Sequence, residues 1–287
     1  MTGFPPAGFS PASFSPEWLR LREPADARAR NLDVAAAMSG RFALRDAVAV
    51  ADLGSGTGAN LRATSALLPN RQSWTLIDHD PALHEAARRE LSSWADAAAV
   101  EGDGLRLSKD RATIDVRFKV CDLARDPQAA FEHEPNLVTA AAFFDLVSAD
   151  FIRLLAGAIA ERRAAFYAVL TYNGVQRWQP HRPADNQMTS AFHRHQMRDK
   201  GFGPAAGPTA PGLLADQFQL EGYSVLEGES PWRLSRGDRM LVEELSRGHA
   251  MAVAETGIVD NKVIESWIKV QRSGADVGHT DIFAAPV

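Results

Sequence analysis

The sequence predicts an α/β protein with a doubly wound, mostly parallel sheet of seven strands and helices on both faces. Three observations support this fold class. Short apolar or β-branched runs alternate with helical segments from residue 48 to residue 172, the first run ends in a glycine cluster, and another run lies at the C-terminal end. Such alternation is typical of parallel sheets, because a helix must return the chain between parallel strands. We expect one large domain with extra N-terminal helices and an elaborated C-terminal part, although 287 residues would also allow two domains.

The N-terminal tail, residues 1–16, is set apart by its proline content. Phe4, Phe9 and Phe14 recur every five residues among four prolines. Proline at this density disfavours a helix and favours extended backbone. The tail is therefore either flexible or docks its phenylalanines on the body of the protein or on a partner chain.

A helical cap is expected next, over residues 17–46. Ser15 and Pro16 form a typical helix start, with serine as the N-cap and proline at the first helical position. Pro24 predicts a break, because proline removes a backbone donor inside a helix. A second helix is expected at about 25–42.

Hydrophobic patterning predicts the strands and helices of the main domain, residues 47–287. The seven strands are expected at 48–53, 73–78, 114–123, 137–144, 164–172, 218–228 and 278–286. The helices are expected at 58–68, 81–98, 148–163, 186–200, 237–255 and 261–272. Residues 103–112 show no clear pattern.

Composition indicates a soluble, cytoplasmic protein that acts on a small molecule. The net charge is −5, from 31 Lys and Arg against 36 Asp and Glu, so the broad basic field of a nonspecific nucleic-acid binder is missing and nucleic acid is not an expected partner. The single cysteine, Cys121, excludes an intrachain disulfide. No apolar run approaches the roughly 20 residues of a membrane span, and the N-terminus lacks the pattern of a signal peptide. The oligomeric state is not predicted.

A glycine cluster follows the first strand, in the segment VADLGSGTGANL. Gly54, Gly56 and Gly58 would form a tight turn in which a ligand can approach the backbone closely. The turn also exposes the N–H groups that begin the next helix. Gly54-x-Gly56-x-x-Ala59 fits the relaxed dinucleotide fingerprint as well, and a turn that merely needs glycine is a third interpretation.

Three carboxylates at the ends of neighbouring strands favour one ligand over the others. Asp52 lies two residues before the first glycine, where it suits a cation better than a pyrophosphate; S-adenosylmethionine (SAM) carries a sulfonium and an ammonium group. Asp78 ends the second strand, where it can accept hydrogen bonds from ribose hydroxyls. Asp122 ends the third strand and could address an adenine amino group. Because the carboxyl ends of these strands form one crevice, a single ligand would meet all three.

These segments resemble a known family. VADLGSGTGANL resembles motif I of the class I SAM-dependent methyltransferases, LIDHDP resembles their second motif, and FKVCDLA resembles the acidic turn after their third strand. The resemblance covers roughly residues 48–171 and implies a Rossmann-like fold with SAM as cofactor. The helical cap resembles the N-terminal extension that many of these enzymes lay over the cofactor. The implied cofactor-binding residues are Asp52, Gly54, Ser55, Gly56 and Gly58 around the methionyl part, Asp78 and His79 at the ribose and adenine, and Asp122 and Leu123 around the base. The family sheet ends in a hairpin, whereas here two helices separate the last two strands.

The catalytic residues are not identified by the sequence. Methyl transfer from a sulfonium is an in-line displacement in which the cofactor supplies the electrophile. An amine, thiolate or carboxylate acceptor needs no general base, whereas an alcohol or phenol does. No catalytic dyad is evident, and the weak candidates after the fourth and fifth strands are Asp145, Tyr172 and His193. Asp145 is equally well explained as a charge at a helix N-terminus.

The segment 172–212 is expected to form a substrate-side lid, together with the helix around Trp18–Arg30. Long irregular connections in compact domains are usually functional. The segment holds five Arg and Lys against two Asp, so it is either a solvated surface or a site for a small, anionic acceptor. His193 and His195 lack helix-face spacing and further ligands, so no metal is expected.

Two alternatives stay open beside a SAM-dependent methyltransferase. One is an NAD(P)-dependent oxidoreductase, because the glycine cluster fits the dinucleotide fingerprint. The other is a non-catalytic binding module that keeps the SAM fold. Neither a G-x-S-x-G elbow nor a Walker A sequence is present.

Overall fold

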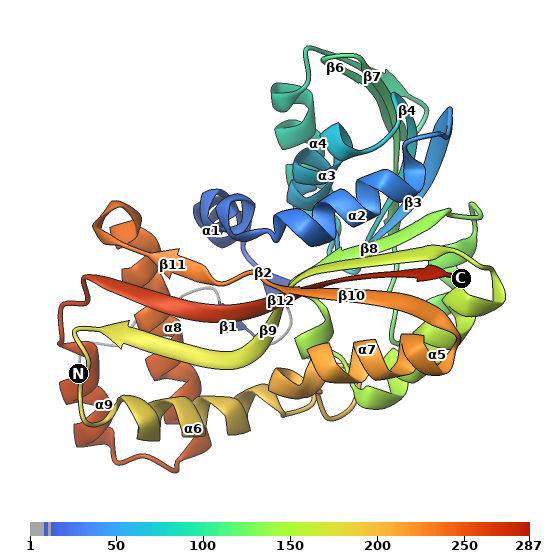
Figure 1. The fold of residues 1–287 in the computed structure, drawn as a ribbon. Helices are drawn as coiled ribbons and strands as arrows, with labels where there is room; N and C mark the ends of the chain where they lie inside the picture. Colours follow the sequence, from blue (N-terminus) through green and yellow to red (C-terminus); the bar gives the residue numbers. More distant parts are fainter. Residues whose placement is uncertain (1–8, 11–12) are drawn as a thin grey trace.

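The structure, a computed structural model, describes residues 9–10 and 13–287, and a ten-stranded sheet organises them (Figure 1). Five strands form its parallel centre, in the order β9-β8-β3-β4-β7. Their bounds are Ala165–Gln179, Leu137–Ala141, Ala47–Leu53, Arg71–Asp78 and Ala112–Val120. The predicted α/β fold with a mostly parallel sheet is therefore confirmed.

The last two predicted strands are present and antiparallel. β12 (Gly274–Pro286) pairs with β9 and lies between it and β10 (Tyr223–Glu229). The expected insertion separates them along the chain, as helices α8 (Arg239–Thr256) and α9 (Asn261–Ile268).

The sheet has ten strands and not the predicted seven. A hairpin of β5 (Ala97–Glu101) and β6 (Gly104–Lys109) extends the β7 edge and occupies the region without a clear pattern. β11 (Trp232–Leu234) pairs with the far end of β12. Outside the sheet, β1 (Phe9–Ser10) and β2 (Ser13–Phe14) form a separate small ribbon within the Phe/Pro tail.

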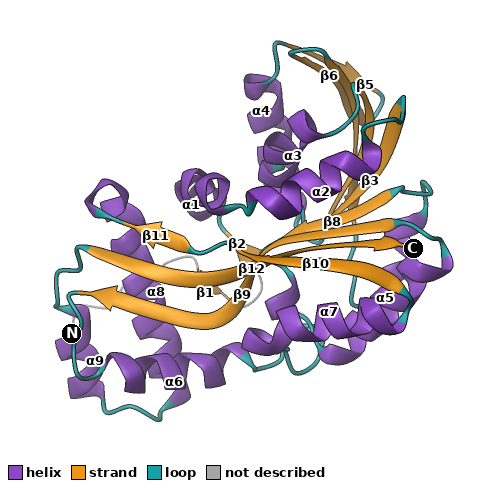
Figure 2. Cartoon of the chain, in the orientation of Figure 1, coloured by secondary structure: helices purple, strands orange, loops and turns teal. Residues whose placement is uncertain are grey.

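Helices cover both faces of the sheet, as Figure 2 shows. On one face, α5 (Ala149–Glu161) and α7 (Ala210–Leu220) share an apolar cluster with Phe166, Phe144 and Ile282. On the other face, α2 (Leu32–Phe42), α3 (Ala59–Thr64) and α4 (Pro81–Trp94) pack with Trp74 and Leu76. Short 3₁₀ turns complete the connections, at Ser65–Leu67, Pro127–Phe131, Phe144–Leu146, Gly207–Thr209 and Arg236–Asp238.

A third apolar cluster lies where β9 and β12 extend beyond the rest of the sheet. α1 (Pro16–Ala29) and β11 pack there, together with α6 (Asp185–Gln196), α8 and α9 (Figure 1). Its polar centre is the buried ion pair between Arg272 and Asp185, whose Nη2 and Oδ1 atoms are 2.9 Å apart. Arg272 also lies over the rings of Trp178 and Trp267.

Several predicted boundaries are wrong. α1 continues through Pro24 and ends before Asn31, whose side chain caps α2 by accepting the N–H groups of Asp33 and Val34. The helix expected at 186–200 ends at Gln196. β7 ends at Val120, before Asp122.

The expected lid segment is also more regular than predicted. Its first part, residues 172–179, continues strand β9 and pairs with β12. Residues 210–220 form α7, so that the strand expected from 218 begins only at Tyr223. Pairing with β12 stabilises the longer strand β9. The sequence did not predict this length, because register with a partner far along the chain has no local sequence signal.

Candidate functional site

The glycine turn after β3 has the backbone that its sequence predicts. Gly54, Gly56 and Gly58 have φ angles of 61°, 53° and 75°, a region that residues with a Cβ adopt only with strain. A Cβ on Gly54 would also lie 2.7 Å from the ring of Phe143. The buried Ser55 donates its N–H to the Ile77 carbonyl at 3.0 Å and so ties the turn to β4, while its Oγ has no partner.

Asp78 at the end of β4 shapes this turn. One carboxylate oxygen accepts the N–H of Gly56 at 2.9 Å, and the other accepts the N–H of Asp80 at 3.1 Å. Burial opposes ionisation of this carboxyl, but the hydrogen bonds from His79, Asp80 and Gly56 outweigh it and lower its pKa. The exposed His79 ring lies beside it, with Nδ1 3.4 Å from the carboxylate. Asp78 is thus an ionised acceptor that lines the glycine turn.

Asp52 lies below the turn and is completely buried. Its Oδ1 accepts a hydrogen bond from Asn60 Nδ2 at 2.7 Å, and its Oδ2 has no partner. Burial raises the pKa of this carboxyl to about 7. Arg30 bonds the oxygen of Asn60 at 2.9 Å and links this network to the end of α1.

Asp122 and Leu123 lie in the turn after β7 and differ in accessibility. The Asp122 carboxylate is exposed, where it accepts the N–H of Ala124 at 3.0 Å and faces Arg125 at 3.3 Å. The Leu123 side chain is buried in the core. The turn is close to Asp78, because the next residue back, Cys121, donates its N–H to the Asp78 carbonyl at 2.8 Å. The structure therefore brings the three predicted strand ends together.

Helix α1 lies over the glycine turn. A Cβ on Gly56 would be 3.0 Å from Leu19 Cδ1. Farther along the helix, Glu23 forms a two-pronged ion pair with Arg62 of α3, with N–O distances of 2.8 and 2.7 Å. Arg20 pairs with Glu90 of α4 at 2.7 Å. An open groove of about 380 Å³ between α1, α3 and α4 is lined by Glu23, Arg62 and Glu90 of these ion pairs and by Arg30, Trp94, Ala141 and Leu170, among others.

The three weak catalytic candidates come together beside this turn, although they come from three separate elements. Tyr172 of β9 places its hydroxyl 2.9 Å from Nε2 of His193, which lies on α6. Asp145, in the 3₁₀ turn after β8, accepts a hydrogen bond from the Tyr172 backbone, and its charge contributes to the raised pKa of the Tyr172 hydroxyl. Burial is the main cause of that rise, and it also raises the pKa of Asp145 to about 6.

Two further residues of this cluster were missed by the sequence analysis. His279 of β12 is the register partner of Tyr172, and their rings are 6.3 Å apart. Arg22 of α1 interacts electrostatically with both Asp145 and His279 and lies over the ring of Trp232 at 4.9 Å. A polar histidine inside the apolar run of the last strand was the available signal for His279. We call Arg22, Asp145, Tyr172, His193 and His279 the acceptor cluster.

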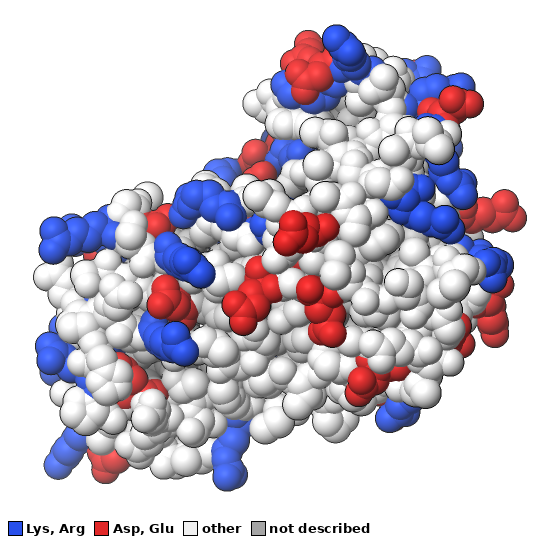
Figure 3. Space-filling view, in the orientation of Figure 1, with Lys and Arg blue, Asp and Glu red and all other residues white. Residues whose placement is uncertain are grey.

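Two basic residues of the segment 172–212 pair with a carboxylate outside this cluster. His195 pairs with Glu255 at 2.9 Å, and Arg198 lies 3.7 Å from the same carboxylate. Basic and acidic side chains are interspersed on the face seen in Figure 3. Among the described residues, no group of three or more His, Cys, Asp or Glu side chains is placed to hold a metal ion.

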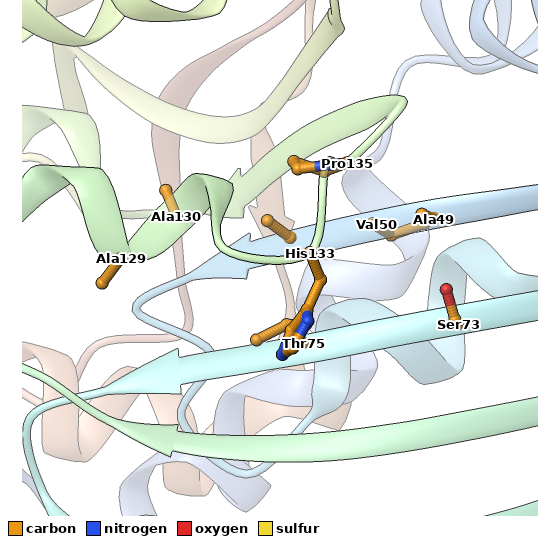
Figure 4. A pocket seen from close by; sticks show the side chains of 9 residues that line it. Ala49, Val50, Ser73, Thr75, Ala129, Ala130, His133 and Pro135 are labelled. Carbon is orange, nitrogen blue, oxygen red and sulfur yellow. The ribbon is translucent and has the colours of Figure 1, made fainter.

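A second cavity lies between β3, β4 and the turn before β8 (Figure 4). Its volume is about 10 Å³, and its lining includes Ala49, Thr75, Ala130 and His133. Such a volume holds at most one water molecule, so this cavity is a packing defect and not a ligand site.

Comparisons with known proteins establish the fold. No protein-family model matches the chain, and no curated protein sequence does. Among solved structures, a cyclopropane-fatty-acyl-phospholipid synthase-like protein from Lactobacillus casei is 14% identical, with a TM-score of 0.55 over 92% of this chain and 91% of that one. A candidate methyltransferase from Bacillus halodurans is 12% identical, with a TM-score of 0.51 over 89% of this chain and 100% of that one. The cyclopropane synthase MmaA2 from Mycobacterium tuberculosis is 12% identical, with a TM-score of 0.50 over 94% of both chains.

These likenesses confirm the predicted Rossmann-like α/β fold with a mostly parallel sheet. The strand order β7-β4-β3-β8-β9-β12-β10 runs through the sheet with β12 antiparallel between β9 and β10. In the part of the chain that the structure describes, no helix is both long enough and apolar enough to span a membrane.

Proposed function

We propose that this protein is a SAM-dependent methyltransferase that acts on a small molecule. The observation that carries the proposal is the coupling of Asp78 to the glycine turn through the Gly56 N–H, at the carboxyl ends of the central strands. This arrangement offers an ionised acceptor for a ribose beside a backbone that a ligand can approach closely.

The residues present fit SAM. The glycine turn forms a cradle that side chains would fill, and the buried Ser55 Oγ has no hydrogen-bond partner. Gly54, Ser55, Gly56 and Gly58 would hold the methionyl part, with the Asp52 carboxyl beneath them. Asp78 and His79 would hold the ribose, and Asp122 with the backbone of Leu123 would face the base. When bound, SAM supplies a methyl group on a sulfonium.

Helices α1 and α6 would close the site in which the methyl acceptor binds, beside the acceptor cluster. α1 contacts the glycine turn through Leu19 and the acceptor cluster through Arg22, while α6 contributes His193. We therefore propose that residues 17–46 cap the main domain, residues 47–287, and that part of the segment 172–212 lies over a small acceptor. The sequence pattern suggested an anionic acceptor; of the basic residues in this segment, His195 and Arg198 pair with Glu255.

Calorimetry with S-adenosylhomocysteine, SAM and NADH tests the proposal. We expect both adenosyl ligands to bind and NADH not to bind, since Asp52 is unsuited to a pyrophosphate. Asp78→Asn removes charge-assisted hydrogen bonds of about 1.5–3 kcal/mol each and should raise the dissociation constant for S-adenosylhomocysteine at least ~10-fold. Asp115→Asn is the matched control, because the Asp115 carboxylate on β7 pairs with Arg106 on the neighbouring strand β6. Binding of NADH alone, or equal affinities in both variants, would contradict the assignment; binding without turnover over a broad acceptor panel would favour a non-catalytic module.

A further inference from the structure

The surroundings of His193 favour one of the two neutral tautomers of its ring. Nε2 faces the Tyr172 hydroxyl at 2.9 Å. The backbone carbonyl of Gly174 favours a proton on this ring, and because Nε2 is engaged by Tyr172, that proton is assigned to Nδ1. A nitrogen that faces a carbonyl must be protonated. Nε2 of the neutral ring is therefore the acceptor, and the Tyr172 O–H donates to it.

Two other buried atoms of the acceptor cluster are hydrogen-bond acceptors without partners. Asp145 is 8% exposed and His279 is 5% exposed, and neither Asp145 Oδ1 nor His279 Nδ1 has a partner. The carbonyl of Ser230 favours a proton on the His279 ring, and we assign that proton to Nε2, which leaves the free lone pair on Nδ1. Buried polar groups in native proteins are almost always hydrogen-bonded. A ligand that satisfies this cluster must bring hydrogen-bond donors.

The acceptor cluster adjoins the glycine turn. Phe143 contacts Gly54, and Asp145 follows two residues later in the same 3₁₀ turn. On α1, Leu19 contacts the glycine turn and Arg22 interacts electrostatically with Asp145. Residues three apart lie on the same side of a helix, about 4.5 Å apart along its axis. A molecule in the cluster would thus lie next to a ligand in the turn.

The only cation of the cluster is already engaged. Arg22 bonds both carboxylate oxygens of Asp26, at 2.8 and 3.1 Å, and stacks over Trp232. With Asp145 nearby, an anionic group entering the cluster would meet a carboxylate and no free positive charge. A neutral donor fits this environment better than an anion does.

We propose that Tyr172 and His193 form a proton relay for the methyl transfer, and that the acceptor is a neutral molecule methylated on a hydroxyl group. This inference rests on the proposed function. An amine needs no base once it is neutral, whereas a hydroxyl must lose its proton as it is methylated. A buried, correctly oriented tyrosine–histidine pair supplies that base.

Atoms and electrons balance in this step. The acceptor oxygen forms a bond to the methyl carbon, and the carbon–sulfur bond breaks with its electron pair going to sulfur. The acceptor proton passes to the Tyr172 oxygen as the Tyr172 proton passes to His193 Nε2. A hydroxyl and SAM become a methyl ether, S-adenosylhomocysteine and a proton held on His193. The imidazolium then releases this proton to solvent.

The tautomer of His193 is the first test, and it needs no acceptor. Nitrogen-15 NMR of the full chain with S-adenosylhomocysteine should show His193 with a protonated Nδ1 and an unprotonated Nε2. Burial lowers the pKa of His193, so the neutral ring should persist to below about pH 6.5. An Nε2–H tautomer, or an imidazolium at about pH 7, would overturn the relay.

Activity is the second test. A library of alcohols and phenols, each matched by the amine, thiol and carboxylate of the same skeleton, is incubated with SAM and the full chain. We expect methyl ethers from hydroxyl members only. Tyr172→Phe and His193→Gln should each lower kcat at least ~100-fold while the affinity for S-adenosylhomocysteine stays within ~2-fold. The matched control is His195→Gln, because His195 is on the same helix but pairs with Glu255 at the surface.

The pH profile separates a base from a structural residue. For wild type, kcat/KM should rise with pH as His193 loses its proton and then level off, and His193→Gln should lose this step. Asp145 titrates near pH 6 in both proteins, and the neighbouring His249 and His279, with pKa values lowered to about 3 by burial, stay neutral in the assay range. Methylation of amines, thiols or carboxylates, methylation of no hydroxyl, or unchanged kcat in Tyr172→Phe would overturn this inference while the proposed function stands. Absence of S-adenosylhomocysteine binding would overturn the proposed function itself.

Discussion

Replacing Asp52 by asparagine should change how the stability of the protein depends on pH. Asp52 is fully buried, with one oxygen bonded to Asn60 and the other without a partner. Its pKa in the folded protein is about 7, against 3.8 for an unperturbed group, because burial penalises the charge. The Asp52→Asn side chain would keep an oxygen for Asn60 and would not ionise.

The magnitude follows from the linkage between protonation and folding. The folded pKa is raised, so the stability supplied by the protonated form is fully present below pH 3.8 and is lost as the pH rises toward 7. Each pH unit in that window is about 1.4 kcal/mol. Between about pH 5.0 and pH 8.5 the wild-type protein should therefore lose about 2–3 kcal/mol of unfolding free energy through Asp52, and Asp52→Asn should not.

Urea unfolding of both proteins at the two ends of that pH range measures this difference. His249 and His279 act in the opposite direction, because their lowered pKa values make stability rise with pH up to about 6.5. They are present in both proteins, as is Asp145, so the comparison isolates Asp52. An unpaired amide in the Asp52→Asn variant would lower stability equally at both pH values. The reasoning is refuted if the two proteins show the same pH dependence.

Two further substitutions test the glycine turn and the buried Arg272–Asp185 ion pair of the third apolar cluster. Gly56→Val should abolish binding of S-adenosylhomocysteine in calorimetry, because Gly56 has a φ of 53° and its Cβ would lie 3.0 Å from Leu19; retained affinity would show that the turn has been misinterpreted. Arg272→Met should lower the unfolding free energy by about 3–5 kcal/mol, because it leaves the buried Asp185 without its cation. Adding Asp185→Asn should recover part of that loss in the same urea titration, and no recovery would mean that the ion pair is not the cause.

Local patterns in the sequence were sufficient for the central sheet and its glycine turn. A buried strand is recognisable from a short apolar run, and a positive φ at Gly54, Gly56 and Gly58 is a property of glycine itself. The resemblance of residues 48–171 to the class I SAM-dependent methyltransferases implied the strand order of that fold. Asp52 and Asp78 could be placed near the turn because each lies at or beside the end of a strand in the sequence.

The sequence alone could not place contacts between distant segments. Tyr172 lies beside His279 because β12 pairs with β9. His193 contacts Tyr172 because α6 packs against the part of β9 and β12 that extends beyond the rest of the sheet. The register that creates these pairs depends on packing over the whole sheet, so no local signal marks it. The sequence also could not predict the length of α1. Pro24 predicted a break, but tertiary contacts keep α1 as one continuous helix over the glycine turn.

The electrostatic state of the candidate site was likewise decided by tertiary structure. From the sequence, Asp52 and Asp78 are equivalent strand-end carboxylates. In the fold, Asp78 receives two backbone N–H groups and has a lowered pKa, whereas Asp52 receives one amide in a fully buried position and has a raised pKa. Sequence determines which residues can ionise; burial and hydrogen-bond donors, which exist only after folding, determine which of them do.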